Sequence, residues 1–313
     1  MPPTSPSAAV AEQIVNAQRT LAGPHPGYRP VHAKGIICSG IFTASAEARR
    51  ISRAAHFQGE PSPTIVRFSN SSGDPEVHDG QPNARALAAK FQLPGGKHAD
   101  ILGLSIEGFA ARTPEEFLAF LQAQLPNAAT GKTTPERAGQ FIQSHPATQA
   151  FIGRLMQKPV PASYAQASYH AQHAFRFTAA DSVRRFGRYL FIPEAGESFM
   201  TSEEGAKRGP DFLREELAGR VARGPVVFRL TLQLAAEGDP TNDPTMLWPS
   251  DRAVVALGRL EIRAISPTGA DDERRLVFDP TNLTDGIELG DDPFPRVRSA
   301  GYAISNDRRS REG

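Results

Sequence analysis

The sequence predicts an α+β protein built on a closed antiparallel β-barrel of about eight strands, with helices inserted between the strands and flanking them. Short β-branched or alternating runs, separated by Gly, Pro, Asp and Asn, are typical of antiparallel strands. These runs form two sets of four with helical segments between them. The 313 residues are 39% hydrophobic and show no internal repeat or low-complexity linker, so we expect a single domain over 1–313.

The first part of the chain predicts a helix and then four strands. AAVAEQIVNAQRTL has helical periodicity and is ended by GPHPG, which gives an N-terminal helix within 1–24. An amphipathic segment at 45–57 follows the first strand. The four expected strands are GIICSGIFTA at 35–44, PTIVRFSN at 63–70, ARALAAKFQL at 84–93 and ADILGLSI at 99–106.

The middle of the chain begins with helices and returns to strands. TPEEFLAFLQAQL at 113–125 opens with a Thr cap, a Pro and two glutamates, and TPERAGQFIQSH at 134–145 repeats this pattern. PDFLREELAGRVARG at 210–224 is a further helix. The second set of strands comprises 169–178, 184–193, 225–236 and 253–265. RVRSAGYAISNDRR at 296–309 has the spacing of a terminal helix.

Charge and composition exclude several classes of protein. The net charge is +1 and the two signs are interspersed, so no field directs the protein to nucleic acid or to an anionic membrane. No run approaches the roughly 18 apolar residues of a membrane span, and the N-terminus lacks the features of a secretion signal. We expect a cytoplasmic protein for the chain as given, or a periplasmic one if a signal segment was removed. Cys38, the only cysteine, is expected to be a buried small hydrophobe.

The candidate chemistry lies in single residues, because the zinc-protease, P-loop, nucleophile-elbow and dinucleotide-binding patterns are absent. His32 opens the first strand, three residues after Arg29. Arg298 lies one helical turn before Tyr302, and Arg309 lies two turns after it. Guanidinium hydrogen bonds favour phenolate over phenol, and a phenolate is a hard oxygen ligand for ferric iron. The alternative is a basic, solvated terminal helix that binds no metal.

Taken together, these residues resemble the haem catalases, and more closely the short catalase-related peroxidases. RPVHAKG is similar to the family's distal-histidine segment, PTIVRFSN to its next strand, and RSAGY to its proximal Arg-x-x-x-Tyr. ARALAAKF, Trp248-Pro249 and FDPTNLTDGIE follow in family order. The resemblance covers about 28–309 and is weakest between 124 and 189.

The resemblance implies a haem b enclosed in the barrel, with Tyr302 as the axial ligand and His32 on the opposite face. It implies that Arg298 holds the tyrosinate and that Ser69 orients His32. Three arginines, Arg29, Arg67 and Arg309, fall on the positions that pair with haem propionates. Val31 and Phe117 correspond to residues that pack near the distal side.

The chain also departs from the family pattern. The asparagine that full catalases pair with the distal histidine is read here as Ser105, after Leu104. A channel aspartate is replaced by Asn83 and a channel valine by Ser71. The long wrapping segment and extra domain of large catalases are not expected. These differences argue against a fast catalase.

The resulting expectation is a haem peroxidase that reduces hydrogen peroxide or organic hydroperoxides with small organic electron donors and has weak catalase activity at most. A haem hydroperoxide isomerase or dehydratase is the first alternative, and a non-catalytic haem carrier or sensor is the second. A homodimer is compatible with these readings, whereas nucleic acid and membrane partners are not expected.

Overall fold

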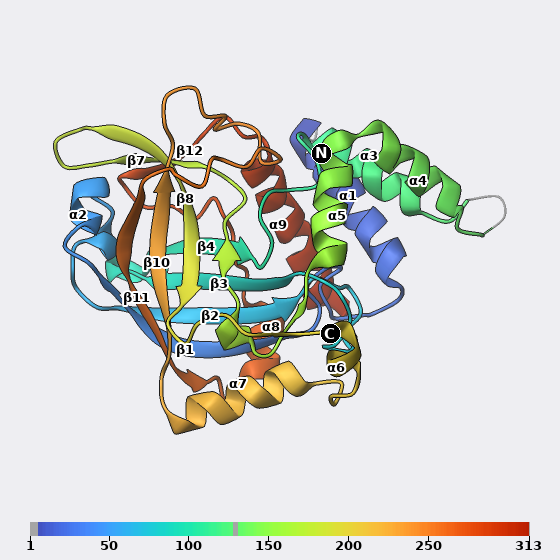
Figure 1. Cartoon of the computed structure of the whole chain (residues 1–313), viewed down its shortest axis with the longest axis horizontal. Coiled ribbons are helices and arrows are strands. Elements are labelled where there is room, and N and C mark those ends of the chain that lie inside the picture. The colour runs from blue at the N-terminus through green and yellow to red at the C-terminus, as the bar shows by residue number, and fades with distance from the viewer. Residues whose placement is uncertain (1–5, 128–130, 313) are drawn as a thin grey trace.

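The computed structural model describes residues 6–127 and 131–312. Its main sheet runs β10-β11-β1-β2-β3-β4-β6-β8, and pairing of β8 with β10 closes these eight strands into a barrel. Every pairing is antiparallel, so the predicted fold class is confirmed (Figure 1). The barrel strands are β1 (Gly35–Ala44), β2 (Ser62–Asn70), β3 (Arg85–Gln92), β4 (His98–Leu104), β6 (Tyr169–His170), β8 (Arg184–Pro193), β10 (Val226–Leu234) and β11 (Val254–Ile265).

Four further strands lie outside the closed barrel. β7 (Phe175–Thr178) and β12 (Ile287–Leu289) extend the sheet from β8, and β5 (Val160–Pro161) pairs with β9 (Phe199–Met200). The expected strand at 169–178 is therefore two strands, of which only β6 belongs to the barrel. The segment expected to be amphipathic at 45–57 contains the short helix α2 (Ala48–Ile51) and one 3₁₀ turn (Ala55–Phe57).

Most helices gather at one side of the barrel, as Figure 1 shows for α1, α3, α4, α5 and α9, whereas α7 lies below it. Apolar residues of α1, α3 and α9 share one cluster. Thr113 caps α3 by accepting a hydrogen bond from the Glu116 backbone N–H, as its sequence predicts. The helices are α1 (Pro6–Ala22), α3 (Pro114–Gln124), α4 (Pro135–Ser144), α5 (Pro146–Gln157), α6 (Ser202–Ala206), α7 (Phe212–Arg223), α8 (Gly269–Arg275) and α9 (Phe294–Glu312).

The interior of the barrel is a packed apolar core. Strand residues alternate between faces, so β2 directs Val66 and Phe68 into this core and places Arg67 and Ser69 on the outer face. Fully buried rings fill the core, among them Phe42, Phe68, Phe91, Phe191 and Phe228. Cys38 is buried there as well, which confirms its expected role as a core residue.

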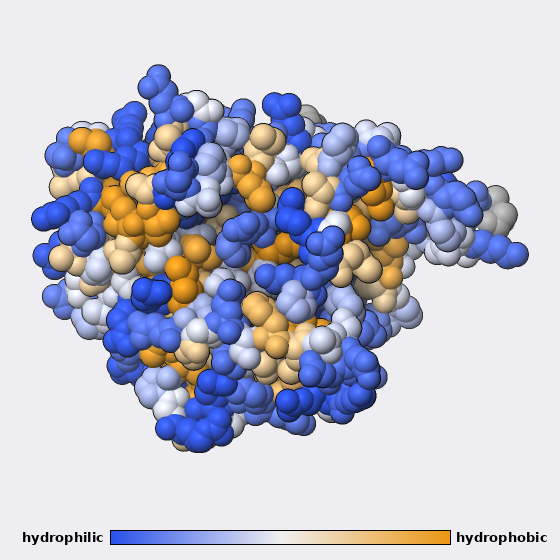
Figure 2. Space-filling view, viewed as in Figure 1, coloured by the Kyte–Doolittle hydropathy of each residue, from blue (hydrophilic) through white to orange (hydrophobic). Residues whose placement is uncertain are grey.

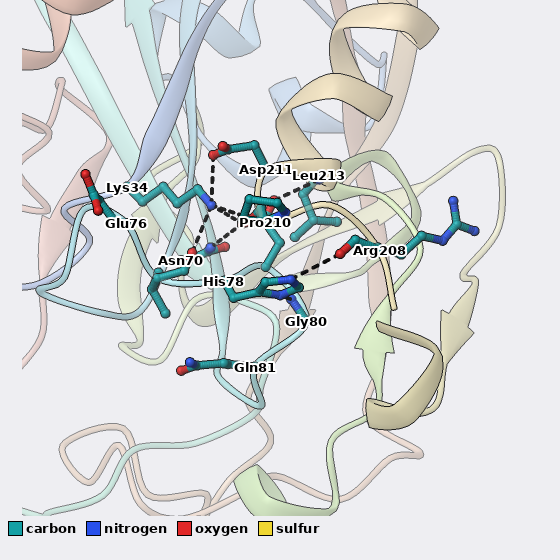
Figure 3. Close-up of polar contacts among 12 residues, drawn as sticks. Lys34, Asn70, Glu76, His78, Gly80, Gln81, Arg208, Pro210, Asp211 and Leu213 are labelled. Carbon is teal, nitrogen blue, oxygen red and sulfur yellow. Dashed lines mark hydrogen bonds and ion pairs between the residues drawn. The ribbon is translucent and has the colours of Figure 1, made fainter. Parts of the chain in front are cut away.

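Lys34, directly before β1, forms ion pairs with the loop between β2 and β3 and with the start of α7 (Figure 3). The Lys34 ammonium lies 2.9 Å from Asp79 and 3.0 Å from Asp211, and it donates to the backbone carbonyls of Val77 and Pro210. Asp79 also accepts hydrogen bonds from Asn70 and from the backbone N–H of Leu213. These contacts fix the chain two residues after His32.

Polar residues cover most of the face seen in Figure 2, with apolar residues exposed in small patches between them. Within residues 6–127 and 131–312, none of the helices combines the length and apolar character that crossing a membrane requires.

Candidate active site

His32 lies on the loop before β1 and faces the outer surface of the barrel. Its backbone adopts the left-handed conformation, with φ of 59°, which is uncommon outside glycine. Its Nδ1 lies 3.1 Å from Ser69 Oγ, on the outward side of β2. Burial, and after it the positive charges of Arg67, Arg298 and Arg29, lower the pKa of His32 to about 3. The imidazole is therefore neutral at pH 7 and able to accept a proton.

Two of the three candidate propionate-binding arginines meet at one carboxylate. Arg67 donates to Glu273 at 2.8 Å and 2.9 Å, and Arg29 donates to Glu273 at 2.6 Å. Burial lowers the pKa of Arg29, and repulsion by Arg67 adds to this effect. Arg67 also donates to the His32 carbonyl at 2.7 Å, which links the arginine cluster to the histidine loop.

Arg309 completes the cluster from α9. It is buried and donates to the Arg274 carbonyl at 3.3 Å. Burial and the charge of Arg67 lower the pKa of Arg309 to about 10, while Glu273 opposes that shift. Two guanidinium groups therefore bond to Glu273, and a third, that of Arg309, lies close enough to feel its charge. This arrangement leaves an excess of positive charge that a ligand with two carboxylates would neutralise.

Tyr302 receives two hydrogen bonds from the arginine one turn before it. Arg298 Nε and Nη2 donate to the Tyr302 hydroxyl oxygen at 3.0 Å and 2.8 Å. Both residues lie on α9, where a spacing of four brings side chains to one face. Hydrogen bonds donated by a fixed cation stabilise the charged form of a phenol.

Two residues that the sequence did not reveal, His173 and Asp292, form a hydrogen-bonded chain with Arg298. Arg298 Nη1 lies 2.8 Å from His173 Nε2, and His173 Nδ1 lies 2.7 Å from Asp292 Oδ2. Burial lowers the pKa of His173, and the hydrogen bond and charge of Asp292 partly oppose it. A neutral His173 that donates from Nδ1 to Asp292 can accept from Arg298 at Nε2. The sequence signal was Asp292 two residues before the start of α9, where it accepts a hydrogen bond from the Phe294 backbone N–H.

Ser105 is not brought to His32. Its hydroxyl accepts a hydrogen bond from the Arg85 backbone N–H at 2.9 Å, and the residue is buried. The register pairs Ser69 with Ala86 and Ala86 with Leu104, so Leu104 shares the outer face with Ser69. The expectation that Ser105 stands in for the distal amide is therefore corrected: Leu104 occupies the row that reaches His32.

The remaining expected residues make no polar contact with the arginine cluster within residues 6–127 and 131–312. Phe117 packs against Phe109, with ring centroids 5.1 Å apart, and against Phe294 at 6.3 Å. Val31 is half-buried directly before His32. Asn83 accepts a hydrogen bond from Arg85, so it lies beside the first residue of β3.

The candidate side chains lie on the outer side of the barrel wall and not in its apolar interior. Its interior is filled with aromatic and aliphatic side chains, whereas Arg67 and Ser69 point away from that core. The chemistry of the outer cluster fits haem b. The three guanidiniums match a dianionic edge, for which the Glu273 carboxylate is a stand-in, and Tyr302 offers an arginine-supported oxygen ligand.

Comparison with known proteins identifies the family of this chain. Residues 24–313 match the model of the catalase family. A catalase-related peroxidase of Mycolicibacterium paratuberculosis is 40% identical over 300 residues, covering 94% of this chain and 93% of that protein. A catalase-related peroxidase of Synechococcus elongatus is 34% identical, covering 96% of this chain and 88% of that protein.

Solved structures share the fold. Catalase A from Saccharomyces cerevisiae superimposes with a TM-score of 0.81 at 20% identity, covering 91% of this chain and 62% of that one. A bacterial catalase gives the same TM-score at 22% identity and covers 98% of this chain. The chain spans 62% of the length of each of these solved catalases. From the extent of the family match and the identity to two near full-length relatives, this chain belongs to the catalase family.

Proposed function

We propose that this protein is a haem-dependent peroxidase that reduces hydrogen peroxide or organic hydroperoxides with small organic electron donors, with weak catalase activity at most. The observation that carries the proposal is a half-buried His32 whose Nδ1 lies 3.1 Å from Ser69 Oγ and whose pKa is lowered by burial and by nearby arginines. One of those arginines, Arg298, donates hydrogen bonds to Tyr302. The two relatives that align over nearly their whole length are both catalase-related peroxidases, which supports the same function.

Membership of the catalase family implies a haem cofactor. In this proposal Tyr302 would hold the iron through its hydroxyl oxygen, to which Arg298 donates two hydrogen bonds. Arg29, Arg67 and Arg309 would bind the propionates, near the place that the Glu273 carboxylate occupies in this structure. The haem iron, when bound, supplies the electron transfer that the side chains cannot.

His32 and Ser69 provide the proton chemistry. The neutral imidazole takes a proton from the peroxide and returns it to the departing oxygen, which makes that oxygen a better leaving group. Ser69 orients the ring by its contact with Nδ1, so that Nε2 is the nitrogen available to the peroxide. The low pKa of His32 keeps this nitrogen free at neutral pH.

Asp292 and His173 position Arg298 from behind. Their hydrogen bonds at 2.7 Å and 2.8 Å fix the guanidinium so that it faces Tyr302. The buried Asp292 carboxylate, which is bonded to His173, also offsets part of the positive charge of Arg298.

The test combines a spectrum with steady-state assays of the holoprotein. Purified protein should absorb as ferric high-spin haem, and Tyr302→Phe should abolish or shift that spectrum. His32→Ala should retain the haem and lose peroxide turnover by about 10²-fold or more. His98→Ala, at an exposed histidine, is the matched control and should leave turnover unchanged.

Two outcomes would contradict the proposal. Equal turnover in His32→Ala and the parent would remove the role of the imidazole. Consumption of a hydroperoxide without consumption of any donor would replace the peroxidase by an isomerase or dehydratase.

A further inference from the structure

A surface cavity of about 620 Å³ lies at one end of the barrel, where β8 begins, β10 ends and β11 begins (Figure 1). Backbone hydrogen bonds join these segments. The Leu234 N–H donates to the Ala253 carbonyl at 2.8 Å, and the Ala235 N–H donates to the Phe186 carbonyl at 2.9 Å. Small-molecule sites have volumes of roughly 300–1,000 Å³. The cavity therefore has the size of such a site, and its wall is fixed by the barrel.

The cavity carries more positive than negative charge. Its charged lining residues are three arginines and two acids: Arg184, Arg185, Arg252, Glu237 and Asp239. Arg252 and Asp239 neutralise each other, because Arg252 Nε and Nη2 donate to Asp239 at 2.8 Å and 3.0 Å. Two arginines then remain with one carboxylate, that of the exposed Glu237. The lining therefore has an excess of one positive charge.

Arg185 is the lining group that most needs a partner. It lies opposite the buried Phe177 in the β7–β8 ladder, so its side chain is on the face that carries the apolar core. Its Nη1 atom is buried and has no hydrogen-bond partner within residues 6–127 and 131–312. Buried donors are nearly always paired, and a charged donor without a partner is costly. This guanidinium therefore points to a bound anion.

The rest of the wall is mainly hydrocarbon, from Phe186, Leu234, Ala235 and Ala253. Leu234 packs against the barrel core. A Cβ added at Gly290 would lie 3.1 Å from Phe186 Cε1, so the ring lies close to the chain at Gly290. An inorganic anion would leave this apolar surface in water, whereas an organic anion with an apolar body would cover it.

We propose that this cavity binds an aromatic monocarboxylate, at a site separate from the haem. The carboxylate accepts hydrogen bonds from Arg185 Nη1 and from the exposed Arg184, and the ring packs against Phe186 and Leu234. One negative charge matches the excess of one positive charge, and a planar carboxylate suits the parallel donors of a guanidinium. The Phe186 ring favours an aromatic body, because paired rings gain energy beyond the area they bury.

The first test titrates naphthoate into the holoprotein by calorimetry, with the visible spectrum recorded in parallel. We expect one equivalent to bind per chain without a spectral change. Naphthamide keeps the rings and lacks the charge, so it should bind at least about tenfold more weakly. Acetate keeps the charge and lacks the rings, so it should also bind at least about tenfold more weakly.

The second test locates the site with three variants. Arg185→Leu should weaken naphthoate binding by about tenfold or more, because it removes the buried charged donor. Ala236→Glu, at an exposed residue of the lining, should weaken binding by about fivefold through charge repulsion without disturbing the core. Arg229→Leu removes an exposed arginine of β10 that does not belong to the lining; it is the matched control and should keep the affinity.

Two results would overturn the assignment: equal affinity of Arg185→Leu and the parent for naphthoate, or equal affinity of the parent for naphthoate and naphthamide. Acetate that binds as tightly as naphthoate would overturn the aromatic ligand and leave a site for small anions. If Arg185→Leu does not fold, unchanged binding in Ala236→Glu has the same force as unchanged binding in Arg185→Leu. None of these results bears on the proposed peroxidase function, which is tested at His32 and Tyr302.

Discussion

Lys34→Met is expected to lower the free energy of unfolding by about 3 kcal/mol. The substitution keeps the aliphatic stem and removes an ammonium group that is almost fully buried, 2.9 Å from Asp79 and 3.0 Å from Asp211. Breaking one side of a buried ion pair costs roughly 3–5 kcal/mol, because the remaining charge is left without its partner. Asp79 keeps two hydrogen bonds, and Asp211 is half exposed, so the lower end of that range applies.

Lys34→Met should also affect His32, which lies two residues before Lys34. A loss of about 3 kcal/mol corresponds to a decrease of roughly 5 °C in apparent melting temperature for a chain of this length. We also expect lower kcat/KM for peroxide, because the left-handed backbone at His32 depends on its neighbours for support. Urea unfolding, thermal melts and steady-state assays measure the three effects.

The control for this prediction is Lys207→Met. Lys207 and its partner Glu203 are both largely exposed, and exposed pairs contribute at most about 0.5 kcal/mol in a helix. Adding Asp79→Asn to Lys34→Met should recover part of the lost stability, because the unpaired buried charge is then removed as well. If Lys34→Met costs less than about 1 kcal/mol, the reasoning from burial and pairing is refuted.

Three further predictions concern titration and the two sides of the site. His56 packs among Phe42, Phe57 and Phe91, and burial lowers its pKa from 6.5 to about 3. Between pH 6.5 and 3 the unfolded chain carries a proton on His56 that the folded chain does not, so stability is lost as pH falls through this range. His56→Phe should therefore reduce the slope of the unfolding free energy against pH, between pH 6 and 4, by about 1.4 kcal/mol per pH unit. An unchanged slope would argue against a buried neutral His56. Asp292→Asn should lower the unfolding free energy by about 2 kcal/mol and shift the absorption spectrum, because His173 loses a charged acceptor. If neither measurement changes, Asp292 does not influence Tyr302. Ser69→Ala should lower peroxide turnover about tenfold with the haem content unchanged, since His32 loses the group that orients it; unchanged turnover would assign that role to another contact.

Much of the fold was predictable because its signals are local. Alternation along 63–70 separates the core residues Val66 and Phe68 from the outward Arg67 and Ser69, and the structure has this same division. The strand at 169–178 was less well predicted. Its two halves read as one run, but β6 pairs with β4 and β8, while β7 pairs with β8 and β12.

The site was predictable where family motifs were short and contiguous. The four-residue spacing of Arg298 and Tyr302 on a helix predicted the hydrogen bonds between them. His173 escaped notice because it lies 125 residues from Arg298 and 119 from Asp292, and no local pattern joins them.

The sequence by itself determined the periodicities: which residues of a strand share a face, and which residues of the last helix lie one turn apart. Only the tertiary structure decided how those faces meet, because strand register and barrel closure depend on contacts between distant segments. The side-chain period of a strand is two, so a shift of one residue exchanges the core face and the outer face. That one-residue difference separates Ser105, bonded to the Arg85 backbone, from Leu104, in the row that reaches Ser69 and His32.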